Sequence, residues 1–220
     1  MIYPLHLIRL VFAASRVGHL RFTFSNTNTP YVLLGATHAS IIGSADVSNI
    51  TLPQGTISID PSAREITGSN PERQDFIIQP ISTPATKWSG YFCARFDTDF
   101  EGYGVANNGT HGDGVKEGKG SILSGYVKFG SKTKVVNVRV GVSFISVDQA
   151  RKNLDAEIPD GTSLEEIAKK TRTEWAEKLD RIQISGATTA EKQTFYTGFF
   201  HTLQVSILAP FDIRSVLQDG

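Results

Sequence analysis

The sequence contains a single cysteine, Cys93, among its 220 residues. One thiol excludes an internal disulfide framework and a cysteine-rich metal site, and it does not favour one redox compartment over another. The 22 lysine and arginine residues are balanced by 22 aspartate and glutamate residues. A formal net charge of zero provides no long-range field that would attract nucleic acid or an anionic membrane, so neither is expected as a partner.

Long apolar runs are also lacking, and no segment has the length that a transmembrane helix needs. The most apolar stretch, residues 1–14, ends in small residues as a signal peptide does. However, Pro4, His6 and Arg9 interrupt it, and no basic residue precedes it, as an export signal would require. We therefore interpret residues 1–15 as an atypical N-terminus rather than a signal peptide, and the localisation stays open.

Two asparagines stand in the acceptor pattern for N-glycosylation. They are Asn49, in Asn-Ile-Thr, and Asn108, in Asn-Gly-Thr. Such triplets also occur by chance, so they favour a secretory route only weakly.

Apolar and polar residues alternate along much of the first 145 residues. The longest alternation covers residues 136–144, where four valines and a phenylalanine interleave with polar residues and glycine. Residues 91–97 show the same pattern, with Cys93, Arg95 and Asp97 on the face opposite the phenylalanines. Strict alternation predicts strands with one buried and one polar face, as antiparallel sheets have.

Further short segments are predicted as strands, and turn residues separate them. Residues 107–120 contain five glycines and are predicted as a loop. Many short strands without helices between them favour a sandwich over a parallel sheet, so we predict a mainly β fold, an antiparallel β-sandwich. The predicted strands are residues 19–24, 31–37, 55–60, 64–68, 91–97, 121–129 and 136–144.

The periodicity changes to that of helices after Ser146. Three pairs of a small polar residue with Glu or Gln three positions later each predict a helix start, as a capping box. Apolar residues at helical spacing follow each pair, and residues 181–185 are predicted as a short strand before the last helix. The pairs are Ser146 with Gln149, Thr162 with Glu165, and Thr188 with Glu191.

Three residues are candidates for contacts with a sugar. Trp88 could offer a flat ring to a sugar face, although aromatic residues that enter a strand more often pack in or beside the core. Arg95 and Asp97 lie two residues apart on one strand face, so they could pair with each other or point at a ligand. The more favoured alternative is an ion pair that covers the sheet, or an interdomain contact.

No constellation in the sequence makes a catalytic or metal site. Glycoside hydrolysis needs two carboxylates that face each other across the sugar, and the sequence does not indicate such a pair. Asp97, Asp99 and Glu101 have the spacing of early calcium ligands in a loop, but the glycine turn and the terminal glutamate are lacking. We therefore assign no catalytic residue and no metal ligand.

Four segments, in order along the chain, resemble glycoside hydrolase family 92, the calcium-dependent exo-acting α-mannosidases. They are residues 90–104 (GYFCARFDTDFEGYG), 138–159 (VRVGVSFISVDQARKNLDAEIP), 175–179 (WAEKL) and 194–203 (TFYTGFFHTL). The similarity extends from about Arg16 to Gln204, and the chain resembles the fungal branch of the family most closely.

The resemblance implies a galactose-mutarotase-like supersandwich over residues 16–146, a helical linker over 147–187 and the first helix of an (α/α)6 toroid over 188–204. Residues 205–220 form a divergent tail outside the family pattern, which favours a fragment. In the family, the catalytic acid and base and the calcium site lie chiefly in the toroid. Calcium is therefore expected in the full-length enzyme, and none is expected to bind this fragment.

The resemblance thus implies the N-terminal, carbohydrate-associated domain of an α-1,2-mannosidase-like, inverting hydrolase that acts on mannose-containing N-glycans. We expect the isolated chain to be inactive, because it lacks most of the catalytic domain. That missing domain is also expected to be the natural packing partner of this chain. The family resemblance also weakly favours a secretory or extracellular location. One alternative is a stand-alone sugar-binding or interaction module. Another alternative is a pseudogene product with an unsatisfied interface, in which the stripe of Phe195, Phe199 and Leu203 is exposed to solvent and drives aggregation.

Overall fold

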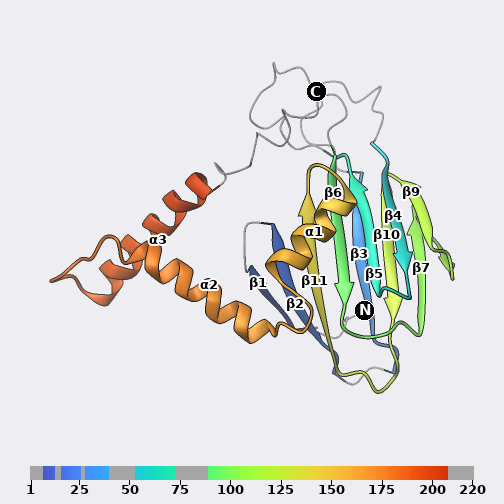
Figure 1. Cartoon of the computed structure of the whole chain (residues 1–220), viewed down its shortest axis with the longest axis horizontal. Helices are drawn as coiled ribbons and strands as arrows, with labels where there is room; N and C mark the ends of the chain where they lie inside the picture. The colour runs from blue at the N-terminus through green and yellow to red at the C-terminus, as the bar shows by residue number, and fades with distance from the viewer. Residues whose placement is uncertain (1–6, 13–15, 26–27, 40–52, 73–88, 208–220) are drawn as a thin grey trace, which may run out of the picture.

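The computed structural model describes residues 7–12, 16–25, 28–39, 53–72 and 89–207. They form two antiparallel β-sheets, stacked face to face, followed by three helices (Figure 1), which confirms the predicted β-sandwich. The seven-stranded sheet has the order β1 (Leu7–Phe12), β2 (Val17–Thr23), β11 (Val135–Ser143), β6 (Gly90–Phe96), β5 (Glu65–Asn70), β4 (Gly55–Asp60), β9 (Glu117–Gly120). The four-stranded sheet has the order β3 (Tyr31–His38), β10 (Ile122–Lys128), β7 (Gly102–Asn107), β8 (Thr110–Asp113). The helices are α1 (Val147–Glu157), α2 (Leu164–Leu179) and α3 (Thr189–Ile207).

The main core lies between the two sheets and comes from alternate residues of their strands. Four phenylalanines meet there with ring centroids 5.2 to 6.2 Å apart, and Ile66 beside them is fully buried. Burial of each such side chain contributes about 1.5–3 kcal/mol, so aromatic packing is a main source of this domain's stability. The four are Phe24, Phe96, Phe100 and Phe129.

Four strands lie where the sequence predicts none. β1 falls within the atypical N-terminus and pairs antiparallel with β2. β7 precedes the predicted loop at residues 107–120, and that loop contains β8 and β9. Asn108 and Gly109 have φ angles of +46° and +80°, which suit the two-residue hairpin turn between β7 and β8. The glycine content therefore reflects turns and close strand packing here, rather than a long loop.

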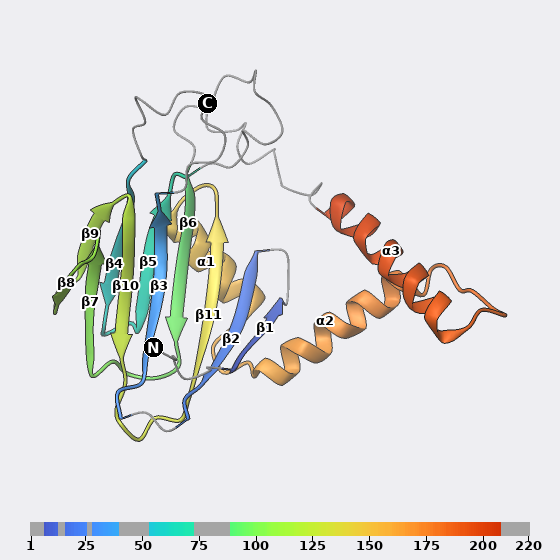
Figure 2. The same ribbon diagram turned by 180° about the vertical axis from the view of Figure 1, so that it is seen from behind.

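The outer face of the seven-stranded sheet is covered by α1 and by the start of α2 (Figures 1 and 2). Val17 and Cys93 on this face are buried in a second core with Leu154 of α1 and Ile167 of α2. The alternation predicts a polar outer face, and the structure buries even His19 there, at 3% exposure. The helices that follow the sandwich, and not solvent, cover the centre of this face.

Each helix begins at a side-chain cap. α3 begins at its predicted box of Thr188 with Glu191. α1 begins at its predicted cap, Ser146, but the Gln149 side chain donates to Asn153 and does not complete the predicted box. α2 begins at Ser163, which makes a capping box with Glu166, so the predicted box of Thr162 with Glu165 is wrong by one residue. Two overlapping pairs fit the pattern, and only the folded chain selects between them. The predicted strand over residues 181–185 is also wrong, because these residues form a turn and irregular chain.

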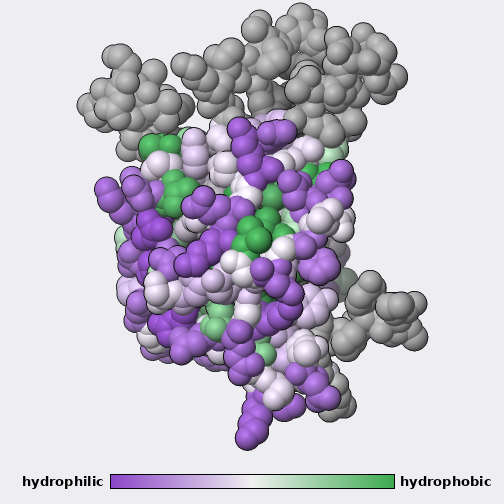
Figure 3. All heavy atoms as spheres, turned by 90° about the vertical axis from the view of Figure 1, so that its right-hand side faces the viewer, coloured by the Kyte–Doolittle hydropathy of each residue, from purple (hydrophilic) through white to green (hydrophobic). Residues whose placement is uncertain are grey.

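α2 and α3 form a hairpin that projects from the sandwich (Figures 1 and 2). Leu164 and Ile167 in the first turns of α2 are buried, whereas none of the described side chains after Ile167 is. Hydrophilic side chains dominate the side of the sandwich where β7 and β9 lie, with only small hydrophobic patches between them (Figure 3). No helix in the described part of the chain is long and apolar enough to cross a membrane.

Gly141 lets α1 approach the sheet closely. A Cβ atom at this position would lie 2.3 Å from the backbone oxygen of Ala150 and 3.0 Å from Cβ of Leu154. We therefore expect Gly141→Ala to lower the free energy of unfolding by about 1–3 kcal/mol. Gly102→Ala is the matched control, because its Cβ would contact only the methylenes of Lys128, at 3.5 Å or more. Equal denaturation midpoints for the two variants would contradict this account.

Candidate functional site

A row of ionisable side chains crosses the outer face of the seven-stranded sheet, beneath α1. The strand register places His19 of β2 opposite Arg139 of β11, Arg139 opposite Arg95 of β6, and Arg95 opposite Glu65 of β5. Residues at one register position lie about 5 Å apart and project to the same side of a sheet. The sheet thus presents a continuous polar row to the helices that follow it.

Glu65 lies at the centre of the charge network, and only 4% of its surface is exposed. Its Oε1 accepts hydrogen bonds from Nε and Nη2 of Arg95, at 2.8 and 2.7 Å. Its Oε2 accepts hydrogen bonds from Nε and Nη2 of Arg151 in α1, at 3.1 and 2.9 Å. A carboxylate can be buried only when its charge is compensated, and here two guanidinium groups from different elements compensate it.

Arg95 and Asp97 do not pair with each other. Nη1 of Arg95 donates to Oδ1 of Asp155 in α1, at 2.6 Å, so this arginine bridges the sheet and the helix. The Asp97 carboxylate accepts hydrogen bonds from the backbone and side-chain nitrogens of Asn137, at 2.9 and 2.6 Å. Arg95 thus has the geometry of an ion pair that covers the sheet, and its contact with a sugar stays a prediction.

Three further arginines attach the linker helices to the sandwich. Arg139 donates to the backbone oxygen of Ile158, at 2.7 Å, and to the Asp160 carboxylate. Arg21 forms a two-pronged ion pair with Glu165 in the first turn of α2. Arg16 binds Glu157 at the end of α1, at 2.8 Å between Nε and Oε1. Together these contacts fix the end of α1, the connecting turn and the beginning of α2.

Cys93 lies beside this network and is fully buried. Burial, and then the negative charge of Glu65, raise the pKa of the Cys93 thiol to about 12. The thiol is therefore protonated at neutral pH and is not a nucleophile. Its small side chain fills the space between the sheet and α1, as a buried cysteine commonly does.

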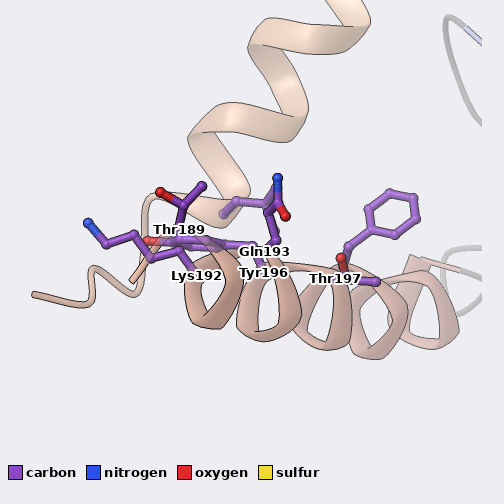
Figure 4. Close-up of a pocket in the computed structure, with 7 residues that line it drawn as sticks. Thr189, Lys192, Gln193, Tyr196 and Thr197 are labelled. Carbon is purple, nitrogen blue, oxygen red and sulfur yellow. The ribbon is translucent and has the colours of Figure 1, made fainter. Parts of the chain in front are cut away.

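A hollow lies between the facing sides of α2 and α3 and has a volume of about 420 Å³. Figure 4 shows the side chains that α3 contributes to it, one turn after another. Nearby, the rings of Trp175 and Phe200 join the two helices with centroids 4.6 Å apart. The lining contains one charged side chain, Lys192, and no carboxylate. It consists of Leu179, Thr189, Lys192, Gln193, Tyr196, Thr197 and Phe200.

Comparison with known families assigns both parts of this architecture. The glycosyl hydrolase family 92 N-terminal domain matches residues 11–143, which include almost the whole sandwich. The chain belongs to glycoside hydrolase family 92. The family 92 catalytic domain matches residues 149–210, which include α2, α3 and most of α1. No curated protein matches the chain.

Solved family 92 structures share the fold. The inverting mannosidase BT2199 of Bacteroides thetaiotaomicron is 23% identical with a TM-score of 0.71, over 86% of this chain and 23% of that chain. The α-mannosidase BT3965 of the same organism is 22% identical with a TM-score of 0.64, over 84% and 24%. The family 92 hydrolase ccman5 is 22% identical with a TM-score of 0.68, over 86% and 24%. The chain therefore spans about a quarter of the length of these relatives.

The described residues do not fit the calcium that family 92 resemblance implies. Asp97 binds Asn137, Asp99 lies 3.5 Å from Arg64, and these side chains do not converge on one point. In the described part of the chain, no group of three or more His, Cys, Asp or Glu side chains is placed to hold a metal ion. We derive no step through calcium from these residues.

The other predicted site residues are placed as follows. Asn108 is exposed at the tip of the β7–β8 hairpin, where an acceptor asparagine is accessible. Trp88 and Asn49 lie outside the described residues. Nothing in the sequence pattern identified Glu65, Arg139 and Arg151 as partners in this network. Glu65 and Arg139 lie in segments predicted as strands and Arg151 lies in a predicted helix, and a charged residue in either element does not by itself identify its partner.

The Glu65 network yields a stability prediction. Glu65→Gln leaves two guanidinium groups without their shared counter-charge, so we expect the free energy of unfolding to fall by about 3 kcal/mol. Water compensates part of the Arg151 charge, because 37% of this side chain is exposed, and this limits the loss. The control is Asp148→Asn, which removes a solvent-exposed partner of the same arginine and should change stability little. Similar losses for both variants, measured by urea denaturation, would refute the central role of Glu65.

Proposed function

We propose that this chain is the N-terminal part of an α-1,2-mannosidase-type hydrolase that removes mannose from mannose-containing N-glycans with inversion. The observation that carries the proposal is the order of the two family matches, with the N-terminal domain over residues 11–143 and the catalytic domain over 149–210. Similar folds occur in solved proteins whose names describe mannosidases, one of them inverting. The fold is consistent with this assignment.

In this proposal, the sandwich over residues 16–146 positions the catalytic domain through the linker over residues 147–187. Support comes from the arginine contacts that join the sheet to both ends of the α1–α2 turn. Because the first turns of α2 are buried against the sandwich, the direction in which α2 leaves it is set by those contacts. A sugar site between two domains requires such a fixed geometry, since small displacements of reacting groups cost catalytic rate.

We further propose that α3, over residues 188–204, is the first helix of the helical toroid within the catalytic domain, and that its aromatic side packs against the other helices of that toroid. The rings of Phe195 and Phe199 lie with centroids 6.2 Å apart, and in this chain Phe195 is exposed and Phe199 is half-buried. The solved relatives are about four times as long, so a domain of sufficient size can cover these rings. The catalytic acid and base and the calcium site are then assigned to that domain.

Hydrolysis of α-1,2-mannobiose tests this proposal. We expect no turnover by the 220-residue polypeptide with added calcium, because the described residues hold no facing pair of carboxylates in the hollow between α2 and α3. A gene product read on in frame past Gln204 should release the β-anomer of mannose first, as seen by proton NMR, and should lose activity in a calcium chelator. Turnover by the short chain, or no mannoside hydrolysis by the longer product, would contradict the proposal.

The exposed aromatic side of α3 predicts self-association of the polypeptide. We expect sedimentation velocity to show concentration-dependent oligomers that decrease in Phe195→Gln and Phe199→Gln variants, because each removes an apolar surface. Val142→Gln is the control, since Val142 is 46% exposed but lies on the sandwich. A monomeric polypeptide at all concentrations would show that α3 needs no partner.

Saturable binding of mannose oligosaccharides that is abolished in Trp88→Ala would favour the sugar-binding module instead.

A further inference from the structure

His19 occupies an unusual position at the base of the linker. It projects from β2 toward the helices, and only 3% of its surface is exposed. Its Nδ1 is the one buried side-chain nitrogen or oxygen in the described part of the chain that has no hydrogen-bond partner. Buried polar atoms are nearly always hydrogen-bonded, so an unpaired imidazole nitrogen needs a physical or functional explanation.

The charged neighbours of His19 are the groups that attach the linker. From β11, Arg139 lies directly opposite and holds the turn after α1 through Ile158 and Asp160. From β2 itself, Arg21 lies two residues along the same face and holds Glu165 of α2.

The other groups near His19 come from β6, β1 and α1. Asp97, at the end of β6, contributes a negative charge but is bound to Asn137. The register places Val11 of β1 opposite His19, and the α1 acids Asp155 and Glu157 are bound by other arginines. No acid among these elements is therefore held by His19.

We propose that His19 is a pH-sensitive latch between the sandwich and α2. A neutral imidazole needs one donor partner and one acceptor partner, whereas an imidazolium carries two N–H donors. Protonation would therefore place an N–H donor at Nδ1 with no acceptor, on a buried cation between Arg139 and Arg21. The strain is relieved when the first turns of α2 lift from β1 and β2 and admit water. This inference concerns linker docking and stands independently of the mannosidase proposal.

The sign of the pH dependence follows from the same geometry. Burial, then the charges of Arg139 and Arg21, lower the pKa of His19 below its usual 6.5, and Asp97 and Glu165 oppose the shift only in part. The docked state thus binds fewer protons than the open state. Docking is complete above the ordinary histidine pKa and weakens as the pH falls below it. Between the His19 pKa values of the open and docked states, the equilibrium constant for opening rises about tenfold for each unit by which the pH falls.

Hydrogen exchange of the 220-residue polypeptide between pH 7.5 and 5 tests the latch. After correction for the intrinsic pH dependence of exchange, we expect amides in residues 164–170 to lose protection as the pH falls, while amides in β6 and β11 keep theirs. His19→Gln should abolish the extra opening, because a neutral amide takes up no proton. His111→Gln is the matched control, since His111 is exposed on β8 and should leave the wild-type profile unchanged.

Two results would overturn the proposal. The first is an unchanged profile in His19→Gln, which would assign the opening to another group. The second is simultaneous loss of protection in α2, β6 and β11, which would show that protonation unfolds the whole domain and does not release the linker. If His19→Gln fails to fold, NMR titration of the wild-type imidazole decides instead: a pKa at or above 6.5 for His19 removes the basis of the latch.

Discussion

The burial of the Glu65 carboxylate is the constraint on which the architecture depends. Its two oxygens face guanidinium groups from β6 and from α1, so the sheet and the helix must be in contact for the charge to be compensated. A buried ion pair adds little stability relative to an apolar contact, but it strongly disfavours every arrangement in which one partner is missing. Glu65 therefore specifies where α1 lies, more than it determines how stable the domain is.

The position of α1 in turn determines the rest of the linker. Arg139 binds the short turn between α1 and α2, and Arg21 binds the first turn of α2. Contacts with the sheet therefore fix the position at which α2 begins. Apolar contacts among Val17, Leu154 and Ile167 supply the favourable free energy beneath these charges. The sandwich and the base of the linker thus form one unit, and His19 lies inside the contact that completes it.

The sandwich and the helical hairpin differ in how they are stabilised. The sandwich has its own aromatic core between two sheets, and the described side chains of the hairpin after Ile167 are all at least partly exposed. This difference matches the family assignment, in which the sandwich corresponds to the N-terminal domain and the hairpin to part of the catalytic domain. The hairpin is thus a small part of what the solved relatives contain, since the chain spans about a quarter of their length.

The sequence by itself determined the elements with strong local signals. Alternation located strands such as β6 and β11, and side-chain caps located the starts of α1 and α3, because both signals arise between near neighbours in the chain. Glycine-rich β8 and β9 escaped detection, since their glycines serve a tight turn and close strand approach that only the partner strands explain. The arrangement around Glu65 was decided by tertiary structure alone. Its partners lie 30 and 86 residues away, and a charge pair at such separation leaves no periodic trace in the sequence.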